Sequence, residues 1–300
     1  MSSRAIHEHD GNDESRATAG SRPGRVMSRK DAPVTEQRSE RRAELYDWFS
    51  SEFYDHHAIR DDLDFYLSYA VNTPGSILEL GCGTGRILVP IAGTGKRITG
   101  LDRSDGMLKI CQGKIDRLQA EVRGRVRLVR ADIRRFDLHE KFSLALIPFG
   151  PFNCLPDTGD QISCLNCVRE HLDDDGSLVF DVWYPKHEEL RMSEHGYHVV
   201  KDQPHFEMPD GRRVQWGIFN ASVDYNRQLI HEEMYYDIDY PGGRKERLIY
   251  PSPVSYFYRY EIEHLLARTG FRIAGLYRDF HKNEFGDQYP SELIVEAVRQ

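Results

Sequence analysis

The chain has 300 residues, a formal net charge of −8, and 39 % hydrophobic and 29 % charged residues. These values are typical of a globular protein with a sizeable core, and the acidic balance argues against a long nucleic-acid-binding surface. No apolar run approaches the ~20 residues that a membrane helix needs, and the N-terminal sequence lacks the apolar region of a secretory signal. We therefore expect a cytoplasmic protein that binds neither nucleic acid nor a membrane.

The first 40 residues contain no aromatic residue and mix both signs of charge among serines and glycines. Such a segment cannot bury enough apolar surface to fold, so residues 1–40 are predicted to be a disordered tail. From about residue 41 to residue 70 the pattern becomes helical and aromatic. Two helices are therefore expected ahead of the first strand.

Strand and helix patterns then alternate along the chain. Apolar strand-like runs end near residues 80, 102, 132, 149 and 183, and helical patterns separate them. Alternation of this kind with continuous apolar strands is typical of a parallel sheet covered on both faces. The fold class predicted is α/β, with a doubly wound, seven-stranded, mostly parallel sheet of the Rossmann-like kind.

The pattern changes after residue 185. Three β-type runs, 212–225, 227–240 and 246–259, are separated by turn signals, which predicts an antiparallel meander. A helix and two further strand runs follow and can complete the main sheet. The expected organisation is a tail over 1–40, an α/β core with N-terminal lid helices over 41–185, an antiparallel β insert that acts as a lid over 186–259, and a C-terminal helix and hairpin over 260–300.

Glycines mark the turn after the first strand run of the core. Glu79 opens an E-x-G-x-G-x-G pattern whose glycines are Gly81, Gly83 and Gly85. Glycines between a strand and a helix let backbone N–H groups approach a ligand closely, at the positive end of the helix dipole. A dinucleotide site would have a further glycine at the position of Arg86, so an NAD-linked enzyme remains a less favoured alternative.

Two aspartates end the next two strand runs. Asp102 lies 21 residues after Gly81, close to the spacing at which an acidic residue binds ribose hydroxyls in related nucleotide sites. Asp132 ends the following run, where a carboxylate could accept a hydrogen bond from the amino group of adenine. An adenosine-bearing ligand with an amino-acid-like end fits this set, which indicates S-adenosylmethionine.

At these motifs the chain resembles the class I S-adenosylmethionine-dependent methyltransferases, in particular a small-molecule branch with an antiparallel insert after the fifth strand. The stretches "ILELGCGTGRIL", "ITGLDRSDGMLKI" and "LVRADIRRFDL" carry the resemblance most specifically. The resemblance implies that the glycines face the methionine part of the cofactor, that Phe149 lies beside it and that Tyr54 closes over it. The cofactor-binding residues expected are Tyr54, Glu79, Gly81, Cys82, Gly83, Gly85, Arg86, Asp102, Arg103, Met107, Ala131, Asp132, Ile133 and Phe149.

The resemblance further implies methylation of a nitrogen or oxygen atom of a small metabolite by an enzyme that can form a homodimer. A protein that binds S-adenosylmethionine without turnover is the alternative. No general-base motif is readable, so His231 is only a weak candidate for a catalytic residue. No metal site is expected, because the five cysteines are scattered and lack ligand-spaced partners. The substrate-pocket candidates are Tyr46, Asn153, Trp216, His231 and Tyr258.

Overall fold

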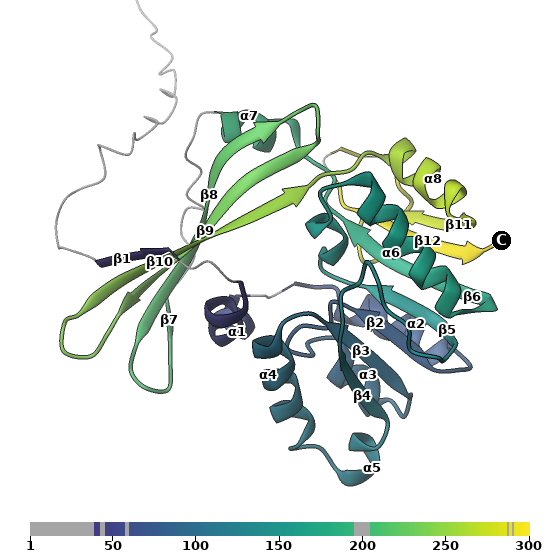
Figure 1. Cartoon of the computed structure of the whole chain (residues 1–300), viewed down its shortest axis with the longest axis horizontal. Coiled ribbons are helices and arrows are strands. Elements are labelled where there is room, and N and C mark those ends of the chain that lie inside the picture. Colours follow the sequence, from purple (N-terminus) through teal and green to yellow (C-terminus); the bar gives the residue numbers. More distant parts are fainter. Residues whose placement is uncertain (1–38, 43–45, 58–59, 195–204, 287, 290) are drawn as a thin grey trace, which may run out of the picture. The chain divides into compact units, whose positions relative to one another are not determined.

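A computed structural model describes residues 39–42, 46–57, 60–194, 205–286, 288–289 and 291–300 (Figure 1). The expected disordered tail falls almost wholly on residues 1–38, which lie outside the described residues. Its last two residues, Ser39 and Glu40, belong to strand β1 (Ser39–Arg42), which pairs in parallel with a strand of the insert. This strand was not predicted, because four polar residues carry no apolar alternation that would indicate one.

Seven strands form the main sheet in the order β11-β12-β6-β5-β2-β3-β4 (Figure 1). Neighbours from β6 to β4 run parallel, whereas β12 is antiparallel to β6 and β11 is antiparallel to β12. The predicted doubly wound sheet and its closing hairpin are thereby confirmed. The strands are β2 (Ile77–Leu80), β3 (Ile98–Asp102), β4 (Val126–Arg130), β5 (Phe142–Ile147), β6 (Leu172–Val182), β11 (Phe271–Tyr277) and β12 (Leu293–Arg299).

Helices cover both faces of this sheet because its strands are apolar on both sides. Leu78 and Leu80 of β2 join a buried cluster with residues of α6 and α8, whereas Ile77 joins a second cluster with residues of α2, α3 and α4. The helical elements are α2 (Leu63–Asn72), α3 (Leu88–Gly93), α4 (Asp105–Ile115), α5 (Ala120–Arg123), the 3-10 turn η1 (Pro151–Cys154), α6 (Thr158–His171) and α8 (Arg259–Arg268).

A second sheet has the strand order β1-β10-β9-β8-β7 (Figure 1). Its long strands β8 to β10 form the antiparallel meander that the sequence predicts. Helix α1 packs on this sheet, with the rings of Phe53 and Tyr236 centred 4.9 Å apart. The elements are α1 (Tyr46–His57), α7 (His187–Glu194), β7 (Phe206–Glu207), β8 (Arg213–Asp224), β9 (Leu229–Asp239) and β10 (Lys245–Ser255).

The chain leaves the main sheet and returns to it at one place. The N–H of Phe257, after β10, donates to the carbonyl of Trp183, just after β6, at 3.1 Å. Asn153 of η1 joins the same two segments, since its Nδ2 donates to the Ser255 carbonyl at 2.6 Å and its Oδ1 accepts from the Trp183 N–H at 3.2 Å. The start and the end of the insert are therefore fixed to each other and to η1.

In the described part of the chain, none of the helices combines the length and the apolar character needed to cross a membrane.

Candidate active site

The carboxyl ends of β2, β3, β4 and β5 lie along one edge of the main sheet, because these strands are parallel. The chain order reverses between β2 and β5, and open α/β sheets bind ligands at such a switch point. Asp102 is the last residue of β3, and the loops after β2, β4 and β5 carry Gly81, Asp132 and Phe149. The structure therefore brings the principal predicted cofactor residues to one edge of the sheet.

The glycine loop after β2 needs its glycines for two reasons. Gly81, Gly83 and Gly85 have φ angles of 71°, 52° and 81°, in the left-handed region that favours glycine. A Cβ atom on Gly81 would collide with the ring of Pro151, and one on Gly85 with the sulfur of Cys111. A Cβ on Gly83 would meet no atom within 4 Å. The middle of the loop thus borders open space, as a ligand cradle requires.

Asp102, the last residue of β3, is hydrogen-bonded to this loop. Its Oδ2 accepts from the Gly83 N–H at 2.8 Å and its Oδ1 accepts from the Ser104 N–H at 2.9 Å. Burial raises the pKa of the Asp102 carboxyl, although these hydrogen bonds oppose the shift. A carboxylate has about four lone-pair sites, so both oxygens keep capacity for the hydroxyls of a ribose.

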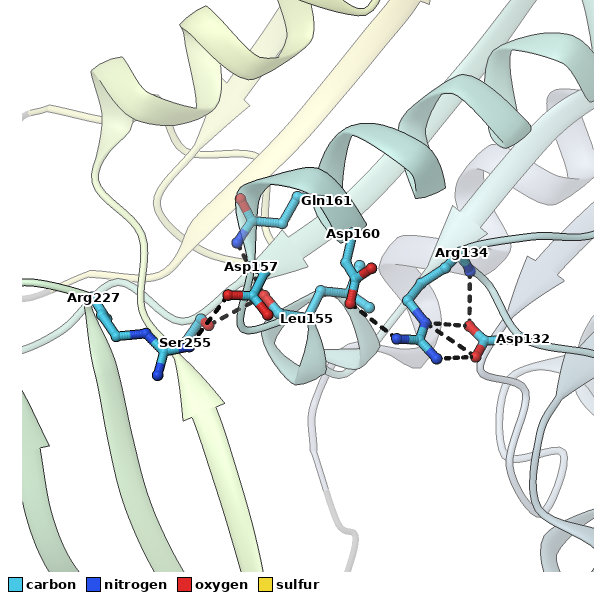
Figure 2. A network of polar contacts seen from close by, with 8 residues as sticks. All are labelled: Asp132, Arg134, Leu155, Asp157, Asp160, Gln161, Arg227 and Ser255. Atoms are coloured by element: carbon cyan, nitrogen blue, oxygen red, sulfur yellow. Dashed lines mark hydrogen bonds and ion pairs between the residues drawn. The ribbon is translucent and has the colours of Figure 1, made fainter.

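Asp132, beyond β4, is paired with Arg134 (Figure 2). The Nε of Arg134 lies 2.9 and 3.0 Å from the two carboxylate oxygens, and a second guanidinium nitrogen lies 2.5 Å from Oδ2. Another nitrogen of the same guanidinium donates to Asp160 of α6 at 2.9 Å. Hydrogen bonding from Arg134 lowers the pKa of the Asp132 carboxyl, which is one-third exposed. The carboxylate is therefore charged, oriented and accessible.

Glu79 lies beneath the glycine loop, in β2. Its side chain is 1 % exposed, and its Oε2 receives no hydrogen bond from the described part of the chain. Burial raises the pKa of the Glu79 carboxyl well above its ordinary value. A buried oxygen without a partner is costly. A hydrogen-bonding group of a ligand bound at the loop would satisfy this oxygen.

Phe149 follows β5, and its ring contacts α1 and the residue after the glycine loop. Its ring meets that of Tyr54 edge to face, with centroids 6.3 Å apart, and the guanidinium of Arg86 lies 5.1 Å from its centroid. Arg86 is also paired with the fully buried Asp62, through two of its nitrogens. Arg86 thus anchors the segment before α2 rather than presenting a free cation to a ligand, and its predicted role in cofactor binding remains a prediction.

The other cofactor candidates occupy different environments. Cys82 and Met107 are buried at 4 % and 2 % exposure, Arg103 is exposed, and Ala131 and Ile133 are half-buried against the core. The positions of these candidates in the sequence did not show which of them are exposed and which are buried in the core.

The candidates for the substrate pocket do not come together. Asn153 is 4 % exposed, and both of its polar atoms are bonded to backbone groups. Trp216 packs in the cluster of Phe53 and Tyr236, whereas Tyr258 is 37 % exposed ahead of α8. His231 is exposed, and strand alternation places it on the face of β9 opposite to Tyr236. The side chain of Tyr46 lies outside the described residues.

Several residues of this edge were not singled out from the sequence. Asp55 of α1 accepts hydrogen bonds from Thr84 at 2.6 Å and from Lys114 at 2.9 Å, which ties α1 to the glycine loop and to α4. Glu232 of β9 and Asp102 both lie near the exposed thiol of Cys154 in η1 and interact with it electrostatically. These partners could not be predicted from the sequence, because they lie far apart along the chain.

Comparison with known proteins agrees with this geometry. Residues 77–176 match the family described as "Methyltransferase domain". A protein of Bacillus subtilis (strain 168) named as a methyltransferase, YqeM, is 26 % identical over 243 residues, which cover 81 % of this chain and 90 % of that protein. The chain therefore carries a methyltransferase domain, and the predicted class of enzyme is confirmed.

Two solved structures share the fold. The sugar N-methyltransferase KedS8 from Streptoalloteichus sp ATCC 53650 has a TM-score of 0.67 at 17 % identity, over 90 % of this chain and all of that one. The amino pentose methyltransferase CalS10 from Micromonospora echinaspora, solved with bound S-adenosylmethionine, has a TM-score of 0.61 at 19 % identity, over 86 % of this chain and 99 % of that one. The prediction of S-adenosylmethionine as cofactor is confirmed, and the glycine cradle, Asp102 and the orphaned oxygen of Glu79 fit it.

Proposed function

We propose that this S-adenosylmethionine-dependent methyltransferase methylates an amino nitrogen of a small polar molecule. Two proteins that share its fold, KedS8 and CalS10, are described as methyltransferases of a sugar nitrogen and of an amino pentose. The likeness in fold does not by itself transfer their substrates. The proposal therefore rests on the site of this chain as well.

The bound cofactor supplies an electrophilic methyl group on a sulfonium. The protein's part in such an in-line displacement is to align the reactants and to exclude water. In this proposal the glycine loop and Asp102, which are hydrogen-bonded to each other, hold the cofactor, and the contacting rings of Phe149 and Tyr54 cover it. A neutral amine attacks with its own lone pair, whereas an alcohol or phenol needs a base to remove its proton during attack.

The observation that carries the proposal is the position of Glu232. Strand alternation places it on the same face of the second sheet as Tyr236, which packs on α1. Glu232 lies near enough to Cys154 of η1, beyond the carboxyl end of β5, for the two groups to interact electrostatically, and Asp102 interacts with the same thiol. An acceptor amine arrives as an ammonium ion at neutral pH, and a carboxylate near the site attracts this cation. The ammonium releases a proton to solvent water before its lone pair attacks the methyl group. Aromatic faces such as that of Phe149 also favour cations.

A comparison of matched acceptors tests the proposal. The purified protein is incubated with S-adenosylmethionine and pairs of sugars that differ only in an amino group or a hydroxyl at the same carbon. We expect S-adenosylhomocysteine and a product one methyl heavier with the amino sugars alone. Methylation of the hydroxyl partners at equal rates would instead favour oxygen as the acceptor atom.

The role of Glu232 has its own test with a neighbouring control. Glu232→Gln is expected to raise the KM for the amine while leaving the affinity for S-adenosylmethionine close to that of the wild type. Glu233→Gln changes a residue on the opposite face of β9 and serves as the control. Equal kinetic effects of the two substitutions would remove Glu232 from the acceptor site.

A further inference from the structure

Phe149 adopts an unusual backbone conformation at the switch point. Its φ angle is 63°, and Gly150 follows with a φ angle of 79°. Left-handed conformations disfavour bulky side chains, and they persist only where the surroundings hold them in place. Because this turn directly follows β5, it directs the chain from the sheet into η1.

A buried carboxylate holds this turn. Asp181, near the end of β6, is 2 % exposed, and its Oδ1 accepts a hydrogen bond from the Phe149 N–H at 2.8 Å. The same oxygen accepts from the hydroxyl of Tyr66 at 2.5 Å, and Oδ2 accepts from Arg60 at 2.8 Å. Hydrogen bonds to a charged acceptor are stronger than those between neutral groups. The Phe149 peptide is therefore fixed through a fully partnered carboxylate.

The ring of Phe149 depends on the orientation of this peptide. It lies edge to face with Tyr54 of α1, and the guanidinium groups of Arg60 and Arg86 lie 5.5 and 5.1 Å from its centroid. Arg60 thus contacts both the Asp181 carboxylate, which fixes the Phe149 peptide, and the Phe149 ring. The ring keeps 36 % exposure, at the edge that carries the cofactor-binding loops.

We propose that Asp181 is a positioning residue for methyl transfer, which acts by holding Phe149 in the conformation that directs its ring toward α1 and the residue after the glycine loop. The proposal rests on methyl transfer from S-adenosylmethionine and does not depend on whether the acceptor atom is nitrogen. Asp181 does not touch the reacting groups. Its effect reaches the reaction through the peptide and ring of Phe149, because in-line transfer is sensitive to small displacements.

The test compares Asp181→Asn and Asp181→Ala with Tyr66→Phe. Tyr66→Phe removes a hydrogen bond to the same oxygen but leaves the one from the Phe149 N–H, so it serves as the matched control. We expect Asp181→Ala to lower kcat about tenfold, with Asp181→Asn intermediate and Tyr66→Phe close to wild type, at temperatures where all three are folded. The acceptor is the amino sugar on which the wild type is most active.

A readout without an acceptor separates this proposal from the proposed function. Hydrogen–deuterium exchange of the peptide that covers residues 146–152 should speed up in the Asp181 variants but not in Tyr66→Phe. Calorimetry with S-adenosylmethionine should show a several-fold loss of affinity in the same variants. If Asp181→Ala does not fold, Phe149→Leu, which keeps the backbone N–H, should lower kcat by a similar factor.

Two results would overturn the proposal. One is wild-type exchange and wild-type cofactor affinity in folded Asp181→Ala, which removes the acceptor of the Phe149 N–H. The other is an equal loss of melting temperature in the Asp181 and Tyr66 variants with no change in kcat, which would make Asp181 purely structural. Failure of the wild type to methylate any amine, with cofactor binding intact, would contradict only the proposed acceptor.

Discussion

The Oδ2 atom of Asp102 lies 2.8 Å from the backbone nitrogen of Gly83, so the carboxylate at the end of β3 and the middle of the glycine loop are one unit. Asp102→Asn replaces the carboxylate by a neutral amide, which is a weaker hydrogen-bond acceptor for the Gly83 N–H and for the hydroxyls of a ribose. Hydrogen bonds to charged groups contribute about 1.5–3 kcal/mol, so we expect a loss of cofactor affinity of about ten- to a hundredfold by calorimetry. Asp105→Asn, which changes an exposed residue of α4, should leave the affinity unchanged.

Replacing Gly83 tests the cradle itself. A side chain there would meet no protein atom, but it would extend into the space expected for the cofactor. The φ angle of 52° would also cost a residue with a side chain about 1–2 kcal/mol of conformational energy. We expect Gly83→Val to fold and to lose measurable binding of S-adenosylmethionine. Gly95→Val is the control, because Gly95 has a φ angle of 94° and open space outside the loop. It should lose stability but keep wild-type affinity.

Glu79→Gln is expected to stabilise the free protein and weaken its cofactor binding. The pKa of Glu79 is raised in the folded state, so its contribution to stability is present below the unfolded pKa and is lost as the pH rises through the folded pKa. The stability gain of the variant should therefore be small in acid and grow with rising pH. Denaturant unfolding across this range measures it. A gain that shrinks with rising pH would contradict the burial of a titrating carboxyl.

The Asp132–Arg134–Asp160 network should matter at the adenine end of the cofactor (Figure 2). Arg134→Ala removes the group that lowers the pKa of Asp132 and orients its carboxylate. We expect a several-fold loss of affinity for S-adenosylmethionine, which increases as the pH falls toward the ordinary range of an aspartate, because Asp132 then becomes protonated. Arg135→Ala, at the neighbouring exposed position, should show neither effect in the same calorimetric series.

Asp62 should be important for stability. It is fully buried and receives two hydrogen bonds from Arg86, so Asp62→Asn leaves a half-buried guanidinium without its counter-ion. Breaking a buried pair in this way typically costs about 3–5 kcal/mol. We expect a large fall in the denaturant midpoint of Asp62→Asn. A change within the experimental error would show that Arg86 finds another partner.

The sequence was sufficient for the core fold because each strand of the main sheet is a continuous apolar run followed by a turn. The runs at Ile77–Leu80 and Ile98–Asp102 fall where they were expected, and the strand ends bring Gly81 and Asp102 to one edge. The local pattern therefore encodes both the sheet and the principal loops that are predicted to hold the cofactor.

Pairings between distant residues were not predictable in the same way. Asp181 and Phe149 are separated by 32 positions, and Thr84 and Asp55 by 29, with no periodicity that links them. The assignment of Asn153 and His231 to one pocket stays a prediction. The sequence does not show that Asn153 is bonded to the Ser255 carbonyl, because that partner is distant along the chain.

The hydrogen bond between Phe257 and Trp183 has an evolutionary consequence. When the two ends of an insertion lie next to each other, the entropic cost of closing the loop changes little with its length. The length and sequence of the insert can therefore change without strain on the main sheet. The segment between these two residues can thus be exchanged at a single junction. A chimaera that carries the corresponding segment of a relative is expected to fold, and its acceptor preference would test the prediction that the insert acts as a substrate lid.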